Sequence, residues 1–134
     1  MVVYGNLFRY VIEPENLFIS WGRFRRGKIK KSDVQQFERN LEQNIFALAR
    51  ELSGKTYKHG SYITFRICDP KPRRVHKATV RDRIIHHAVF RILNLAYEPT
   101  FISTSFSCRV GKGTHRGVLA VETMLRRVSQ NYTR

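Results

Sequence analysis

The stretch Tyr62–Lys77, YITFRICDPKPRRVHK, decides the fold, because the sequence changes here from a helical to an alternating pattern. In its first half, apolar residues alternate with polar ones, which is the period of a β-strand with one buried face. The two prolines of Asp69–Pro72 indicate a turn. Because Arg73–Lys77 can return as a second strand, the stretch predicts a β-hairpin. Its buried face is expected to hold Ile63, Phe65 and Ile67.

The predicted hairpin is strongly basic. Its tip and outer face carry Arg66, Lys71, Arg73 and Arg74. Side chains alternate along a strand with a period of two, so Tyr62 shares a face with Arg66. Tyr62 is therefore a candidate for stacking on a nucleic-acid base.

Helical periodicity surrounds the hairpin on both sides. The sequence predicts a short helix from Pro14 to Gly27, longer helices over 32–53 and 80–97, and a last helix from Thr114. The resulting order is helix, helix, hairpin, helix, loop, helix. This order predicts an α+β fold that is mostly helical, in a single domain over 1–134.

The two long predicted helices carry recognisable caps and stripes. Ser32 and Gln35 have the spacing of a capping box, and Thr79 is placed to cap the helix over 80–97. The buried stripe of that helix is predicted as Val80, Ile84, Ala88, Ile92 and Leu95. Its polar, basic stripe is Arg83, His87, Arg91 and Asn94.

The charge of the chain points to an anionic partner. The chain has 25 Lys and Arg against 10 Asp and Glu, a formal net charge of +15. Nucleic acid is the commonest polyanion that neutralises such a domain. An anionic membrane surface is the alternative, but the charge is spread over several predicted elements rather than one amphipathic helix.

The remaining composition indicates a soluble, cytoplasmic protein without a membrane span. The N-terminus lacks the apolar core of a signal peptide, and no apolar run approaches ~18 residues. The two cysteines, Cys68 and Cys108, suggest neither a disulfide framework nor a metal pair, and buried, reduced thiols are expected.

Two local patterns could bind ligands. The turn Gly111–Thr114 leads into a helix, where free amides and Lys112 could hold a phosphate; a simple capping turn is the alternative. It is no P-loop, because Phe106 stands where the first glycine would fall. The neighbouring His86 and His87 point about 100° apart on a helix, so no metal site is expected from them.

Three blocks of sequence together resemble a known family. They are Pro70–Arg73 (PKPR), Arg81–Ala88 (RDRIIHHA) and Ser105–His115 (SFSCRVGKGTH). In this order they resemble reverse transcriptases of the bacterial group II intron-like lineage. The resemblance is closest to diversity-generating-retroelement enzymes, with their patterns RDRVVHHAL and SYACRxGKGTH. It extends over Asn16–Arg127, and three ordered blocks are more specific than any one.

The resemblance implies that the chain is the fingers portion of an RNA-directed DNA polymerase. It assigns Lys71 and Arg73 to the triphosphate of the incoming deoxynucleotide. Arg74 stands where proline is common, so either Arg73 or Arg74 could fill the arginine role. Arg66 matches a position near the templating base, and Arg109–His115 would lie by the template–primer. The nucleic-acid-binding residues expected in total are Arg66, Arg83, Arg91, Arg109, Lys112 and His115.

The same resemblance places the bond-forming chemistry elsewhere. The first palm aspartate is expected soon after Tyr132, and the Tyr-x-Asp-Asp motif later still; neither occurs in the sequence. The chain is therefore expected to lack palm, thumb, catalytic residues and cofactor, whereas the full-length transferase would use Mg²⁺. Its expected partners are an RNA template, an RNA–DNA hybrid, a deoxynucleoside triphosphate and the missing palm.

Two other functions compete with this interpretation. One is a stand-alone RNA-binding accessory module built on the fingers fold. The other is a helix-turn-helix DNA-binding regulator that uses the basic helix Thr79–Tyr97, although no second helix joined to it by a short turn is evident.

Overall fold

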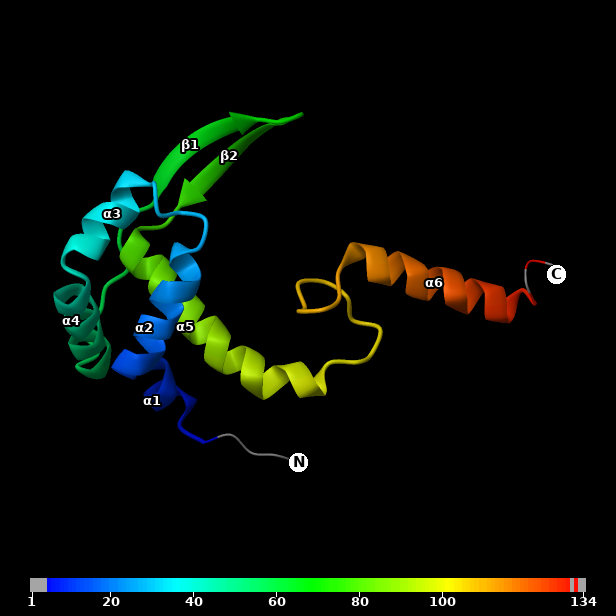
Figure 1. The fold of residues 1–134 in the computed structure, drawn as a ribbon, viewed down its shortest axis with the longest axis horizontal. Coiled ribbons are helices and arrows are strands. Elements are labelled where there is room, and N and C mark those ends of the chain that lie inside the picture. Colours follow the sequence, from blue (N-terminus) through cyan, green and yellow to red (C-terminus); the bar gives the residue numbers. More distant parts are fainter. Residues whose placement is uncertain (1–4, 131, 133–134) are drawn as a thin grey trace. The chain divides into compact units, whose positions relative to one another are not determined.

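The computed structural model describes residues 5–130 and 132 of the chain. It consists of two units, Met1–Ala96 and Tyr97–Arg134, and each is described on its own. The described residues form six α-helices and one antiparallel hairpin, which confirms the predicted α+β, mostly helical fold (Figure 1). No helix in this part of the chain is long and apolar enough to cross a membrane.

The first unit contains most of the secondary structure. Its elements are α1 (Leu7–Ile12), α2 (Pro14–Arg25), α3 (Ser32–Arg39), α4 (Leu41–Ser53), β1 (Ile63–Cys68), β2 (Pro72–Lys77) and α5 (Val80–Tyr97). The second unit holds a short 3₁₀ turn, η1 (Glu98–Thr100), and α6 (Thr114–Val128). The predicted helices starting at Pro14, Val80 and Thr114 are confirmed, whereas α1 was not predicted.

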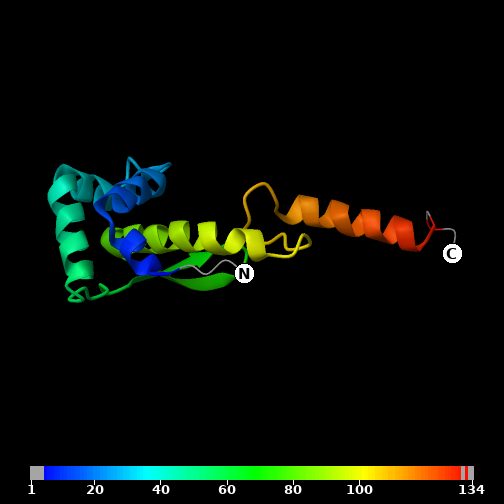
Figure 2. The ribbon, with the colours of Figure 1, turned by 90° about the horizontal axis from the view of Figure 1, so that it is seen from below.

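The core of the first unit lies between α5 and the helices that precede the hairpin. Leu17, Ile45 and Ile84 are completely buried there, one each from α2, α4 and α5. The ring centroids of Trp21 and Phe37 are 5.2 Å apart, which joins α2 to α3. Figures 1 and 2 show α2 running beside α5 in both views, and hydrogen bonds between the two helices agree with this.

The predicted helix over 32–53 is wrong in one respect, because it is two helices that meet at Asn40. Asn40 leaves the helical backbone region, with φ −123° and ψ 44°. The side chain of Asn44 donates to the carbonyl of Phe37 at 2.9 Å, which satisfies an acceptor that the break would leave without a partner. The predicted capping box is also wrong: Ser32 lies inside α3, and no side chain caps that helix at Lys31.

The N-terminus of α5 agrees with its prediction. The Oγ1 of Thr79 accepts from the backbone amide of Asp82 at 3.3 Å, as a capping residue should. Four residues of the predicted stripe are buried, but Leu95 is 65% exposed and wrongly placed in it. Ala96 is buried instead, since the stripe turns slightly along the helix.

The hairpin confirms the predicted strands but corrects their burial. Ile63, Phe65 and Ile67 are 61%, 43% and 41% exposed, so the predicted buried face of β1 is wrong. The core cluster of the described residues contains no side chain from β1 or β2. Alternation reports that one face of a strand is apolar, but burial needs a second layer packed against that face. Cys68 and Cys108 are likewise exposed rather than buried.

Candidate nucleic-acid interface

The strand register divides the hairpin into two faces. Ile63, Phe65 and Ile67 pair with Lys77, Val75 and Arg73, and together they form the apolar face. Thr64 pairs with His76, and Arg66 pairs with Arg74, on the other side. We call this second side, residues 64, 66, 74 and 76, the basic face.

This register separates the two candidate arginines. Arg73 and Arg74 are neighbours in β2, so their side chains leave opposite faces of the hairpin. Arg74 lies directly across from Arg66 on the basic face, whereas Arg73 lies across from Ile67. The choice between Arg73 and Arg74 that the sequence leaves open is therefore a choice between two faces of the hairpin. Arg74 lies on the face that also carries a second cation, Arg66.

Four cations of the hairpin have no partners among residues 5–130 and 132. The ion pairs found there involve none of Arg66, Lys71, Arg73 and Arg74. All four are exposed. Like charges placed directly opposite each other destabilise a strand pair, so the Arg66–Arg74 pair opposes hairpin pairing, and an anion between the two would relieve this cost.

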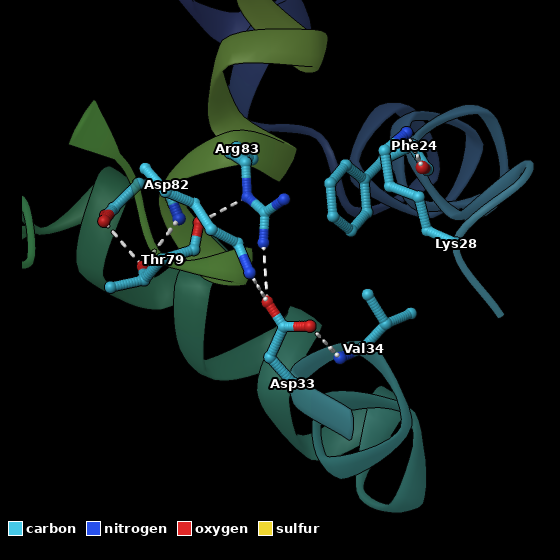
Figure 3. A network of polar contacts seen from close by, with 8 residues as sticks. Phe24, Lys28, Asp33, Val34, Thr79, Asp82 and Arg83 are labelled. Atoms are coloured by element: carbon cyan, nitrogen blue, oxygen red, sulfur yellow. Dashed lines mark hydrogen bonds and ion pairs between the residues drawn. The ribbon is translucent and has the colours of Figure 1, made fainter. Parts of the chain in front are cut away.

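The base of the hairpin is tied to the helices through Asp33. Its carboxylate accepts from Lys77 Nζ at 2.7 Å and from Arg83 at 2.9 Å (Figure 3). The hydrogen bond from Lys77, helped by the charges of Lys77 and Arg83, holds the pKa of Asp33 below its ordinary value against a smaller opposing effect of burial. The guanidinium of Arg83 also lies 4.7 Å from the ring centre of Phe24.

Two basic residues predicted for nucleic-acid binding are therefore engaged inside the chain. Arg83 belongs to the Asp33 network, and Arg91 donates to Asn16 Oδ1 at 2.8 Å. Asn16 is buried and in turn donates to the backbone of Val11 at 3.0 Å. These contacts give both arginines a packing role that the sequence pattern does not reveal.

The second unit shows the same pattern around Arg109. Its guanidinium pairs with Glu98 at 2.8 Å and donates to the carbonyls of Ile102 and Ser105 at 3.0 and 3.1 Å. Lys112 donates to the carbonyl of Ser103. Arg109 and Lys112 thus hold the loop in shape, whereas His115 is exposed at the start of α6.

The predicted turn before α6 is present. Gly111 and Gly113 have φ of 70° and 119°, a region of backbone conformation that favours glycine. Gly113 is the N-cap residue of α6, and no side chain supplies a capping hydrogen bond there. The arrangement fits either of the two predicted roles, a phosphate site or a capping turn.

A buried carboxylate that sequence reasoning did not single out organises the approach to α5. Asp82 is 1% exposed and accepts from Tyr57 OH at 2.5 Å and from Thr79 Oγ1 at 2.6 Å. The amide of Gly60 also donates to it, at 3.2 Å. A Cβ on Gly60 would stand 2.8 Å from Thr79 Cγ2, so the close approach requires glycine. We call Asp82, Tyr57, Thr79 and Gly60 the Asp82 cluster.

The titration of the Asp82 cluster follows from these contacts. Burial alone would raise the pKa of Asp82, but hydrogen bonds from Thr79, Tyr57 and Gly60 outweigh it and hold the pKa below the ordinary value. Burial and the hydrogen bond to Asp82 raise the pKa of Tyr57. The cluster therefore stays as a carboxylate with neutral donors over the physiological range.

Acid should destabilise the first unit through these carboxylates. The unfolded carboxyls titrate near 3.8 and the folded ones lower, so stability is fully present above about pH 4 and lost as the pH falls through the folded values. Urea titrations followed by the fluorescence of Trp21 should show that loss as the pH falls below about 4. Asp82→Asn should show a smaller acid step. A free energy of unfolding constant down to pH 2 would contradict the assignment.

A chain of neighbouring rings runs beside the basic face, and the sequence suggested only its tyrosine. His59 lies between His86 of α5 and Tyr62, with ring centroids at 5.7 and 4.9 Å. Tyr62 meets His76 of β2 edge-on at 6.4 Å. We call His86, His59, Tyr62 and His76 the ring ladder. The four histidine and tyrosine positions show no periodicity in sequence, so only the fold reveals their proximity.

The search for metal ligands and the comparisons with known proteins assign no function to the chain. No group of three or more potential metal ligands is found among the residues that the structure describes. A scan against protein-family models finds no match for the chain. A search of curated proteins finds no match either.

Proposed function

We propose that the chain is the nucleic-acid- and nucleotide-binding fingers part of a cytoplasmic RNA-directed DNA polymerase, in which the hairpin holds phosphates. In this proposal the chemistry of bond formation belongs to the palm, as the resemblance implies. The role of this chain in the proposal is to bind and orient the template and the incoming deoxynucleotide.

The observation that carries the proposal is the contrast between two sets of cations. Arg83, Arg91 and Arg109 are held by partners inside the chain. Arg66, Lys71, Arg73 and Arg74 of the hairpin are exposed and have no partner among the described residues. A cation without an internal partner keeps its hydrogen-bonding capacity for a ligand, and phosphate oxygens match both ammonium and guanidinium donors.

The proposal favours Lys71 and Arg74 as the triphosphate contacts, rather than Lys71 and Arg73. Arg74 lies beside a second cation, Arg66, and can contribute to one anion site. Arg73 leaves the other face, next to Ile67. The prolines at positions 70 and 72 flank Lys71 and restrict the turn, so less ordering is needed when a ligand binds.

Nucleotide binding tests this assignment. Fluorescent deoxyadenosine triphosphate should bind the chain, and Lys71→Ala or Arg74→Ala should each weaken it about tenfold, the loss of one charged hydrogen bond. Arg73→Ala is the matched control, because it removes the same charge one residue away and should change affinity about twofold or less. Equal losses at Arg73 and Arg74, or no binding of the triphosphate, would contradict the assignment.

A stand-alone RNA-binding module is the second candidate, since the same exposed cations would serve it. It predicts RNA binding without preference for a triphosphate over a monophosphate, so titrating deoxyadenosine monophosphate beside the triphosphate separates it from the first proposal. A helix-turn-helix regulator is disfavoured, because Arg83 and Arg91 of α5 are already engaged within the chain.

A further inference from the structure

The ring ladder adjoins the basic face without a break. The last ring of the ladder, His76, is itself a residue of the basic face. There its Nδ1 lies 2.9 Å from Thr64 Oγ1. The next pair along the strands is Arg66 and Arg74. Rings and guanidinium groups therefore follow one another along a single side of the hairpin.

The rings are ordered but still accessible. His59 holds Tyr62 by stacking at 4.9 Å, and yet Tyr62 remains 54% exposed. His76 and His86 are also exposed. An aromatic ring that is fixed in place and open to solvent loses little conformational freedom when a second ring stacks on it.

The ladder is also fastened to the Asp82 cluster. His59 Nδ1 lies 3.8 Å from Asp82 Oδ2, and the neighbouring Gly60 amide donates to the same carboxylate. Asp82 is buried, and its carboxylate oxygens accept hydrogen bonds from groups inside the chain. The contacts of His59 and Gly60 with Asp82 fix the position of the ladder relative to the start of α5.

We infer that the ring ladder and the basic face together form a track for single-stranded RNA, with the bases on the rings and the phosphates on Arg66 and Arg74. The inference rests on the proposed function and adds the form of the nucleic acid and the means of its recognition. Stacking on rings requires unpaired bases, because bases within a duplex already stack on one another. Recognition by ring faces and phosphates tolerates any base sequence.

Two oligonucleotides of equal charge separate the rings from the cations. Decauridylate and a ten-unit abasic ribose-phosphate chain carry the same phosphates, but only the first has bases to stack. At about 0.1 M salt the chain should bind decauridylate about tenfold more tightly than the abasic chain, as expected for one or two stacked bases. Deca-glutamate, an acidic peptide without bases, should compete poorly.

Variants locate the effect on the ladder. Tyr62→Ser should abolish the preference for decauridylate and leave the affinity for the abasic chain unchanged. Tyr62→Phe keeps the ring and should keep the preference. The emission of the buried Trp21 reports that each variant is folded. Because the comparison of the two oligonucleotides needs no variant, the test survives a variant that fails to fold.

The outcomes are distinct. Equal binding of the two oligonucleotides by the unmodified chain, effective competition by deca-glutamate, or a preference that persists in Tyr62→Ser would overturn the ladder and leave the proposed phosphate site intact. Failure of both oligonucleotides to bind would overturn the ladder and the proposed function together.

Discussion

Replacing Asp82 by alanine is expected to lower the free energy of unfolding of the first unit by about 3 kcal/mol, because several partly buried donors would lose their acceptor at once. Tyr57 OH, Thr79 Oγ1 and the Gly60 amide all donate to this carboxylate. Each unsatisfied buried group costs about 1–3 kcal/mol, and local rearrangement recovers part of the sum.

Urea unfolding followed by Trp21 fluorescence measures this loss, since the chain's one tryptophan lies in the first unit. Asp69→Ala is the matched control, because Asp69 is exposed in the hairpin turn and has no partner in the described part of the chain. It should change the free energy of unfolding by less than about 0.5 kcal/mol. A loss below about 1 kcal/mol for Asp82→Ala would mean that the Asp82 cluster does not hold the approach to α5.

Removing both arginines of the basic face should have the second large effect. The double variant Arg66→Ala, Arg74→Ala is expected to bind single-stranded RNA about 25-fold more weakly at about 0.1 M salt, as two lost phosphate contacts release fewer counterions. Folding should be unaffected or slightly improved, since two like charges across a strand pair are removed. Fluorescence anisotropy with a labelled decauridylate measures the affinity.

A charge-matched control distinguishes a site from general attraction. Arg39 and Arg50 are exposed on α3 and α4, away from the hairpin in sequence, and their side chains have no partner in the part of the chain that the structure describes. Arg39→Ala, Arg50→Ala lowers the net charge by the same amount and should weaken RNA binding about threefold or less. A loss equal to that of the hairpin variant would show that net charge alone attracts RNA.

Local chemistry made the hairpin and α5 predictable. The alternation before Asp69, the two prolines of the turn and the cap at Thr79 each act over a few residues, and the structure has all three. The break at Asn40 was not predictable in the same way, because the apolar stripe continues through it. An apolar stripe shows which side of a helix is apolar. The same pattern arises whether the residues form one helix or two consecutive helices.

Contacts between distant residues explain what the sequence could not show. Arg83 meets Asp33 across 50 positions and Arg91 meets Asn16 across 75, so their basic stripe was interpreted as a ligand surface. The cap at Thr79 was predictable from neighbouring residues, but Tyr57 and Gly60 reach Asp82 from an irregular segment. The exposure of Ile63 and its neighbours is a further case, since periodicity identifies an apolar face without naming what covers it.

The salt dependence of RNA binding tests the central claim, that the basic face of the hairpin contacts phosphates, more directly than any affinity at one salt concentration. Each phosphate contact on a single strand contributes about 0.7 to the slope of log affinity against log salt. The account predicts that Arg66→Ala, Arg74→Ala makes the slope shallower by about 1.4, whereas Arg39→Ala, Arg50→Ala changes it by less than about 0.5. A hairpin variant that kept the original slope would contradict the account.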